Sequence, residues 1–215
     1  MHGNEYRETT KVLAICGSLK KTSTTRKALR LALDGAEAAG ASVGFADLTS
    51  YDLALCTGDK SPDAKGKDFA CLRQEIRFAH GLIVATPEYH GSFSGLLKNA
   101  LDLHDIDDLQ GKVVAIVATA GGKQGGSGAL AGLRGVFKAL KAWVLPQDVS
   151  ISEAHKAFAE DGSAVDGALQ LRLNELGRHL ARFAALHSET ALIRPAPAPN
   201  APVAGAPAVS APIPG

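Results

Sequence analysis

The sequence contains few of the residues that mark several classes of protein. Its 215 residues include three cysteines, Cys16, Cys56 and Cys71, and no pair has the Cys-x-x-Cys spacing of a zinc or dithiol site. This usage predicts reduced thiols in a reducing compartment, so we expect a cytoplasmic protein. Residues 1–10 hold no apolar stretch of the secretory kind, and no apolar run approaches the roughly 20 residues of a membrane span. We therefore expect no membrane partner.

Neither sign of charge predominates, because 23 lysines and arginines face 22 aspartates and glutamates. A net charge of +1 gives no basis for expecting nucleic acid as a partner. Aromatic residues make up only 5% of the chain, but 46% of it is hydrophobic, which suffices for one globular core. We expect a single domain over residues 11–187, preceded by a flexible segment at residues 1–10.

The composition changes after residue 187. Seven of the ten prolines lie between Pro195 and Pro214, interleaved with alanine, and no charged residue follows Arg194. Such a segment cannot form a packed core, so residues 188–215 are predicted to be a disordered, Ala/Pro-rich tail. A role for this tail in contacting a partner stays open as an alternative.

Apolar runs and helical periodicities alternate along the rest of the chain. Strands are predicted at residues 11–16, 42–47, 81–86 and 112–119, and within 143–151. Helices are predicted at residues 24–39, 67–79, 94–104, 127–140 and 165–187, and residues 48–66 are predicted to form a loop. The alternation predicts an α/β fold, with a doubly wound five-stranded parallel sheet in the order 2-1-3-4-5 and helices on both faces.

Three of these strands end in unusual turns, and in that strand order the three turns share one edge of the sheet. The first is Gly17-Ser18-Leu19-Lys20-Lys21-Thr22-Ser23. Its hydroxyl groups surround the start of a helix, where free N–H groups and the helix dipole favour an anion. Lys20, Lys21 and Arg26 add positive charge. Phosphate binding is the favoured interpretation, and simple helix capping beside solvated lysines is the alternative.

The second and third turns have features suited to a flat ring. The run from Thr86 to Asn99 (TPEYHGSFSGLLKN) is predicted to form a strand-to-helix turn carrying a rigid proline, an acid and an aromatic ring. The third turn, Ala120-Gly121-Gly122, allows a ligand to approach the backbone closely. Together the three turns suggest flavin mononucleotide (FMN), although Tyr89 and Glu88 taken alone are also compatible with ordinary surface positions.

The segments "GSLKKTS" and "TPEYHGSFSGLLKNALD", with the later Gly125-Gly126 and Leu133-Arg134, resemble the NADPH-dependent FMN reductase family. The resemblance covers about residues 11–187 and implies a flavodoxin-like fold. It also implies a homodimer or homotetramer, with the nicotinamide site near a subunit interface.

The resemblance further implies which residues hold the FMN. The phosphate would be held by Ser18, Lys20, Ser23 and Thr25. The ring would be lined by Pro87, Glu88, Tyr89, His90 and Ser92, and closed on its other side by Thr119, Ala120, Gly121 and Gly122. The family usually has Arg at the position of Lys20 and Asn at the positions of Thr25 and His90. Lys keeps the charge but loses the bidentate fork.

The sequence therefore predicts an NAD(P)H-dependent, FMN-containing oxidoreductase that passes hydride to a small acceptor: a flavin, quinone, azo compound or metal oxyanion. No catalytic side chain is predicted, because the flavin carries the chemistry. A one-electron carrier of the flavodoxin type and a flavin-based redox sensor are the alternatives. No metal site is expected: Asp102, His104, Asp105, Asp107 and Asp108 lack a diagnostic ligand spacing and are interpreted as solvated groups.

Overall fold

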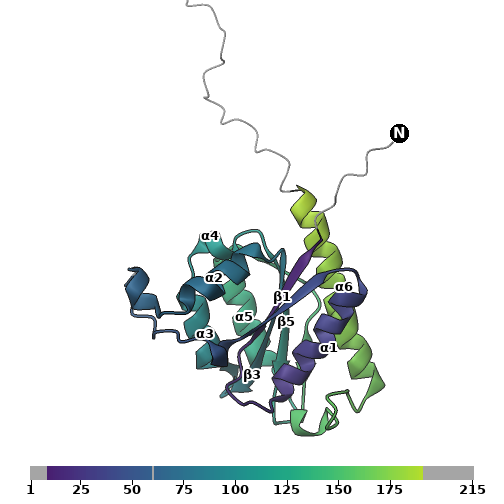
Figure 1. Ribbon diagram of the computed structural model, residues 1–215. Coiled ribbons are helices and arrows are strands. Elements are labelled where there is room, and N and C mark those ends of the chain that lie inside the picture. The colour runs from purple at the N-terminus through teal and green to yellow at the C-terminus, as the bar shows by residue number, and fades with distance from the viewer. Residues whose placement is uncertain (1–8, 60, 191–215) are drawn as a thin grey trace, which may run out of the picture.

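The computed structural model describes residues 9–59 and 61–190, except for the side chains of residues 62, 63, 189 and 190. A twisted parallel sheet forms its centre (Figure 1). Its strands follow the order β2 (Ser42–Asp47), β1 (Lys11–Cys16), β3 (Gly81–Tyr89), β5 (Val113–Thr119) and β6 (Trp143–Val144). The strand β7 (Val149–Ile151) also pairs with β5, next to its carboxyl end. β1, β3 and β5 are almost wholly buried, which explains their continuous apolar sequences.

Helices cover both faces of the sheet. One face carries α1 (Thr24–Ala38) and α6 (Gly167–Thr190), which lie side by side in Figure 1. The other face carries α2 (Phe69–Phe78), α3 (Gly95–Asp102), α4 (Ile106–Leu109) and α5 (Ser127–Ala139). Each layer closes its own apolar core against the sheet. The doubly wound, flavodoxin-like prediction is confirmed, including the strand order, since β2-β1-β3-β5-β6 corresponds to 2-1-3-4-5.

Several local predictions differ from the structure. The fifth strand is divided into β6 and β7 by residues 145–148. The predicted loop at residues 48–66 contains two short 3-10 helices, Leu48–Ser50 and Pro62–Lys65, and a third one lies at Ala154–Lys156. The helix predicted to reach residue 104 ends at Asp102 and is followed by the separate short helix α4.

The largest difference lies after Thr86, where a strand-to-helix turn was predicted and the chain forms a β-hairpin. β3 continues through Pro87 and Glu88 to Tyr89, and β4 (Ser92–Phe93) returns antiparallel to it. His90 and Gly91 form the two-residue loop, and both have positive φ, 51° and 78°. Two-residue hairpin loops favour such left-handed conformations because they match the twist of the strands. The hairpin carries Tyr89 out beyond the sheet edge.

The ends of the chain are described only in part. α6 continues to Thr190, three residues past the predicted domain boundary. Most of the predicted tail, residues 191–215, and most of the predicted N-terminal segment, residues 1–8, lie outside the described residues. Among the described helices, none combines the length and the apolar character needed to cross a bilayer.

Candidate functional site

The carboxyl ends of β1, β3 and β5 bring the three predicted turns together. Gly17, directly after β1, donates its amide to the carbonyl of Ala85 in β3 at 2.8 Å. The hydroxyl of Ser94 donates to the carbonyl of Gly17 at 2.6 Å, which joins the first turn to the hairpin region. The predicted sharing of one edge is therefore confirmed by direct hydrogen bonds between these segments.

The first and third turns are joined by two threonine side chains. The hydroxyls of Thr25 and Thr119 lie 2.7 Å apart, and both residues are buried. Thr25 was predicted to contact phosphate through its hydroxyl, but that group is already hydrogen-bonded to Thr119. Its backbone amide, by contrast, lies in the first turn of α1 and makes no hydrogen bond within the described residues.

Glu88 joins the second turn to α5, the helix that follows the third turn. Its carboxylate accepts a hydrogen bond from the amide of Ala129 at 2.8 Å, in the first turn of α5. Gly126, the residue that caps α5, has no side chain to do so. Glu88 therefore supplies the negative charge that a helix N-terminus favours, and it fixes the hairpin against α5.

The first turn presents donors and cations toward the edge. Ser23 caps α1, accepting the Arg26 amide on its hydroxyl at 3.1 Å, and Ser18 is buried just after β1. The amides of Thr24 and Thr25 are free of partners within the described residues. The exposed side chains of Lys20 and Lys21 make no ion pair there either. A helix N-terminus with free amides, a buried hydroxyl and unpaired cations fits a phosphate group.

Arg26 has a different role from the one that its charge predicted. Its Nε donates to Asp47 at 3.1 Å, and its Nη1 donates to the carbonyls of Lys20 and Lys21 at 2.6 and 2.8 Å. Burial raises the pKa of the Asp47 carboxyl, but hydrogen bonds from Arg26 and Thr49 outweigh this and leave the pKa below its usual value. Asp47 is thus ionised, and the Arg26 charge is neutralised within the fold.

The ring-lining predictions separate into buried and exposed residues. Pro87 and Ala120 are buried in the sheet and its edge, so they contribute backbone and shape. The exposed positions are Tyr89, His90, Ser92, Gly121 and Gly122. Tyr89 is 56% exposed as a residue, which leaves it free to contact a ligand. A Cβ placed on Gly121 or Gly122 would meet no atom within 4 Å, so open space lies in front of both. Open space and an exposed ring beside a helix N-terminus with free amides fit a flavin.

Ser94 was not among the predicted site residues. As the N-cap of α3, its hydroxyl accepts the amide of Leu97 and donates to the carbonyl of Gly17. Its backbone amide donates to the hydroxyl of Thr86. A serine before an apolar helical run is a cap signal in sequence. Its bond to Gly17, 77 residues away, depends on the tertiary fold and carries no sequence signal.

The comparisons with known proteins identify the family of this chain. The sequence model of the NADPH-dependent FMN reductases matches residues 10–156. The chain belongs to this family. It is an NAD(P)H-dependent oxidoreductase with FMN as cofactor and NADPH as hydride donor.

Individual relatives agree with that assignment. The reductase is 29% identical to an NADPH azoreductase of Bacillus sp. (strain OY1-2), over 83% of its own length and 95% of the relative's. It is 37% identical to an FMN-dependent NADPH-azoreductase of Staphylococcus aureus (strain USA300), over 47% and 54% of the two lengths. The solved structure of an NADH:FMN oxidoreductase is 29% identical and superposes with a TM-score of 0.67, over 81% and 90% of the two chains.

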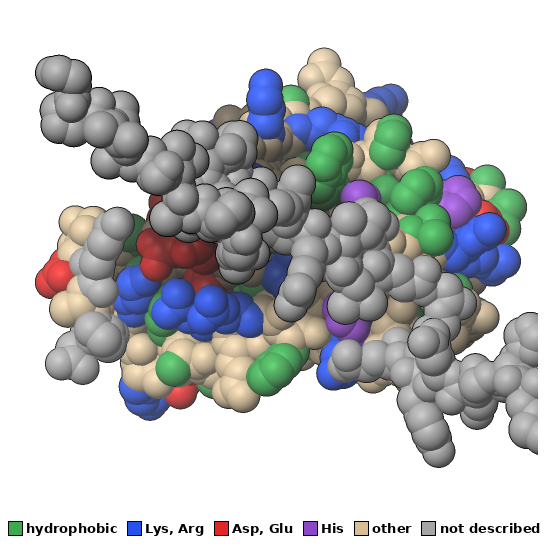
Figure 2. Space-filling model, turned by 90° about the horizontal axis from the view of Figure 1, so that it is seen from above, with side chains coloured by type: hydrophobic (Ala, Val, Ile, Leu, Met, Phe, Trp, Pro, Cys, Tyr) green, Lys and Arg blue, Asp and Glu red, His purple; other side chains and the backbone are tan. Residues whose placement is uncertain are grey.

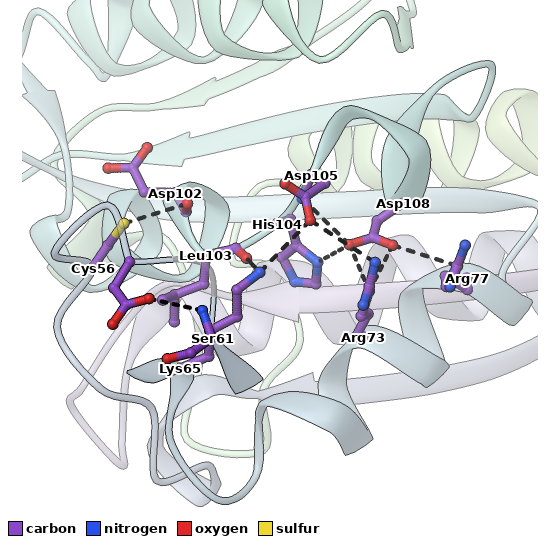
Figure 3. Close-up of polar contacts among 11 residues, drawn as sticks. Cys56, Ser61, Lys65, Arg73, Arg77, Asp102, Leu103, His104, Asp105 and Asp108 are labelled. Atoms are coloured by element: carbon purple, nitrogen blue, oxygen red, sulfur yellow. Dashed lines mark hydrogen bonds and ion pairs between the residues drawn. The ribbon is translucent and has the colours of Figure 1, made fainter. Parts of the chain in front are cut away.

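A second group of polar side chains lies at the opposite end of the reductase. Arg73 of α2 bonds both carboxylate oxygens of Asp108 at 2.8 and 2.9 Å, and the ring of His104 lies 3.2 Å from the same carboxylate (Figure 3). Asp108 precedes β5, so this cluster belongs to the amino ends of the strands. Figure 2 views that end and shows basic and acidic side chains close together where the grey chain leaves it visible.

The interpretation of this group as solvated acids is wrong for Asp108, which is 1% exposed, and for His104, which is 7% exposed. Burial lowers the pKa of His104, although Asp108 opposes that effect. Burial raises the pKa of Asp108, but hydrogen bonds from Arg73 and His104 outweigh it and lower that pKa. Within the described residues, no group of three or more His, Cys, Asp or Glu side chains is placed to hold a metal ion. The cluster attaches α4 to α2 and lies at the other end of the strands from the three turns.

Proposed function

We propose that the reductase holds FMN across the three joined turns and passes its reducing equivalents to a flat, aromatic small-molecule acceptor. The observation that carries this proposal is a set of bonds that join the turns and the elements next to them: Ser94 to Gly17, Thr25 to Thr119, and Glu88 to Ala129. All three bonds are made within the protein itself, so the edge does not need a ligand to hold it together. A preorganised edge binds a ligand without the cost of ordering loops.

The phosphate would lie at the start of α1. There the Thr24 and Thr25 amides and the Ser18 hydroxyl supply donors, and Lys20 supplies charge. Ser23 would act mainly by holding the helix terminus in shape, since its hydroxyl already accepts the Arg26 amide. Charge-assisted contacts of this kind are the strong ones in phosphate recognition.

The ring would lie between the hairpin and the third turn. Tyr89 and the open space before Gly121 and Gly122 provide the surface, and the backbone of residues 88–91 would face the polar edge of the ring. FMN, when bound, supplies the redox chemistry: it can accept hydride from nicotinamide and pass the reducing equivalents to the acceptor. The protein's part is to orient both partners over one exposed face and to exclude water, which requires no acidic or nucleophilic side chain.

An azo compound or a quinone is the acceptor that we propose. The supporting observation is that two similar proteins are azoreductases. Such acceptors are flat and aromatic, and they suit the surface that Tyr89 offers. A cytoplasmic location and a homodimer or homotetramer belong to the same proposal. The three cysteines, all free thiols, support the location.

The test uses purified protein loaded with FMN. Anaerobic NADPH should bleach the bound flavin, and adding an azo dye or a quinone should restore the colour over many cycles. Lys20→Ala should weaken FMN binding by about 1–3 kcal/mol through the loss of a charge-assisted contact. Lys138→Ala, which removes an exposed lysine at the end of α5, serves as the matched control.

Protein that binds FMN but consumes NADPH only with a protein acceptor would favour the carrier alternative instead. The net charge of +1 argues against that alternative, because carriers of this kind rely on a strong single-signed surface for docking.

A further inference from the structure

Arg26 is held by several hydrogen bonds at this edge, unlike the exposed side chains of Lys20 and Lys21. Its guanidinium bonds Asp47 on one side and the carbonyls of Lys20 and Lys21 on the other, at 2.6 and 2.8 Å. Its own backbone amide is bound by Ser23. The Arg26 side chain thus connects the end of β2 with the middle of the first turn, and its backbone amide contacts the cap of α1.

These contacts make Arg26 unsuitable as a phosphate ligand. Its charge is balanced by the ionised Asp47, which itself is held by the amide and hydroxyl of Thr49 at 3.2 and 2.9 Å. The forked geometry of a guanidinium is what allows one side chain to satisfy a carboxylate and two carbonyls together. An ammonium group on a lysine lacks that fork.

The contacts do fix the orientation of the turn. A carbonyl oxygen carries partial negative charge and would repel an anion. The Arg26 fork holds the carbonyls of Lys20 and Lys21 against itself, so these two oxygens are occupied rather than free to face a ligand. The side chains of Lys20 and Lys21 and the free amides of Thr24 and Thr25 then remain for an anion at the helix terminus.

We propose that the Arg26–Asp47 pair is the positioning device that makes this site select a phosphorylated flavin over an unphosphorylated one. The proposal rests on the function proposed above and concerns its phosphate end. Arg26 acts on the ligand only through the turn that it holds, and Asp47 acts only through Arg26.

A positioning role for the pair predicts a different effect of substitutions on FMN affinity from the one that the charges of Arg26 and Asp47 alone would predict. If both residues acted by their charge alone, Arg26→Gln would weaken FMN binding and Asp47→Asn would strengthen it, since removing a negative charge favours an anion. If they act as a positioning pair, both substitutions weaken it. The double variant should then be little worse than either single one, because each removes the same device.

The experiment measures the dissociation constants of FMN and of riboflavin, which lacks the phosphate, for flavin-free protein by fluorescence titration. Wild type should prefer FMN. In Arg26→Gln and Asp47→Asn we expect FMN to bind about tenfold to a hundredfold more weakly, the range for a few displaced hydrogen bonds to a charged group. Riboflavin binding should change by no more than about twofold, because its ring end does not touch the pair.

Arg26→Lys and Arg30→Gln complete the set. Arg26→Lys keeps the charge without the fork, and should behave like Arg26→Gln. Arg30 lies one turn further along α1, with its guanidinium 4.2 Å from the centre of the Phe45 ring in β2, so its removal alters charge and helix–strand packing without touching the turn. Arg30→Gln should leave the preference for FMN intact. Circular dichroism confirms folding, and Asp47→Asn tests the pair even if an Arg26 variant does not fold.

Stronger FMN binding in Asp47→Asn, or an unchanged preference for FMN in the Arg26 variants, would overturn the inference and leave the proposed function standing. A wild-type protein that binds riboflavin as tightly as FMN would instead show that no phosphate lies at α1, and both proposals would fail.

Discussion

The hydroxyls of Thr25 and Thr119 lie 2.7 Å apart, although the two residues are 94 positions apart in the sequence. Thr25 belongs to the first turn of α1, and Thr119 is the last residue of β5. Both are buried, so each hydroxyl depends on the other for its hydrogen bond. The pair sets the distance between the proposed phosphate end of the site and its third turn.

Replacing one member of this pair should therefore be worse than replacing both. Thr25→Val leaves the buried hydroxyl of Thr119 without its partner, which should lower the free energy of unfolding by about 1–3 kcal/mol. The double variant Thr25→Val/Thr119→Val, with two apolar groups of similar shape, should recover much of that loss. Urea unfolding of flavin-free protein measures both effects. Thr24→Val, at the adjacent half-buried position, is the control, and strictly additive losses would contradict the coupling.

Glu88 should contribute to stability although it was predicted as a ring-lining residue. Its carboxylate accepts from Ala129 at the start of α5, 2.8 Å away. Glu88→Gln keeps an acceptor but removes the charge, and should cost about 0.5–1 kcal/mol. Glu88→Ala removes the cap altogether and should cost about 1–2 kcal/mol. Thermal unfolding with Glu160→Gln as an exposed control checks this order, and equal melting temperatures for all variants would refute the capping role.

The placement of the site at one sheet edge could be predicted from sequence for a physical reason. Buried parallel strands have continuous apolar sequences, and their carboxyl ends meet at the same edge once the strand order is known. Ser18 and Ser23 follow such a strand and precede a helical period, so their approximate position was determined by local pattern alone. The structure places both at the predicted turn, buried beside the helix terminus.

The partners of the charged residues could not be predicted in this way. Arg26 bonds Asp47, 21 residues away, and Arg73 bonds Asp108, 35 residues away. The sequence shows which residues carry opposite charges, but it does not show which of them the fold brings into contact. The hairpin was missed because β4 has only two residues, too few to show the alternation of a strand.

The hairpin gives a backbone reason for the residue at position 90. His90 has a φ of 51°, in the left-handed region, where Asn and His are tolerated better than most residues. An asparagine at this position would suit the same backbone conformation. His90→Asn should leave the melting temperature unchanged or slightly raised. His90→Val should lower stability by about 1–2 kcal/mol, because a β-branched side chain is strained in this conformation. Similar stability for the two variants would show that the loop adapts.

The stability of the protein should depend on pH through His104. Its folded pKa lies below the ordinary value because the ring is buried. The unfolded chain therefore takes up a proton near pH 6.5 that the folded protein does not, and stability falls as the pH drops below that value, by up to about 1.4 kcal/mol per pH unit, until the folded pKa is reached. His104→Phe should remove this slope, since Asp108 keeps its bonds from Arg73.

Urea unfolding of wild type and His104→Phe at pH 7.5, 6.5 and 5.5 measures the slope. His155→Gln, which changes an exposed histidine outside the cluster, should preserve the wild-type dependence. Parallel curves for wild type and His104→Phe would assign the pH dependence to other groups. Asp108 is not expected to contribute in this window, because its lowered pKa moves its loss of stability to more acidic conditions.

The open space before Gly121 and Gly122 allows a substitution that should change FMN affinity without changing the stability of the fold. A side chain at either position would meet no atom of the protein within 4 Å, and neither glycine has a positive φ. Gly122→Leu should therefore leave the melting temperature of flavin-free protein nearly unchanged, within about 0.5 kcal/mol in stability. If the flavin ring occupies this space, the leucine side chain would displace it. FMN affinity should then fall by about tenfold or more, which corresponds to about 1.4 kcal/mol or more of binding free energy. Gly135→Leu provides the control, because its position on α5 also faces open space but lies away from the three turns. Undiminished FMN affinity in Gly122→Leu would place the ring elsewhere, even if the phosphate lies at α1.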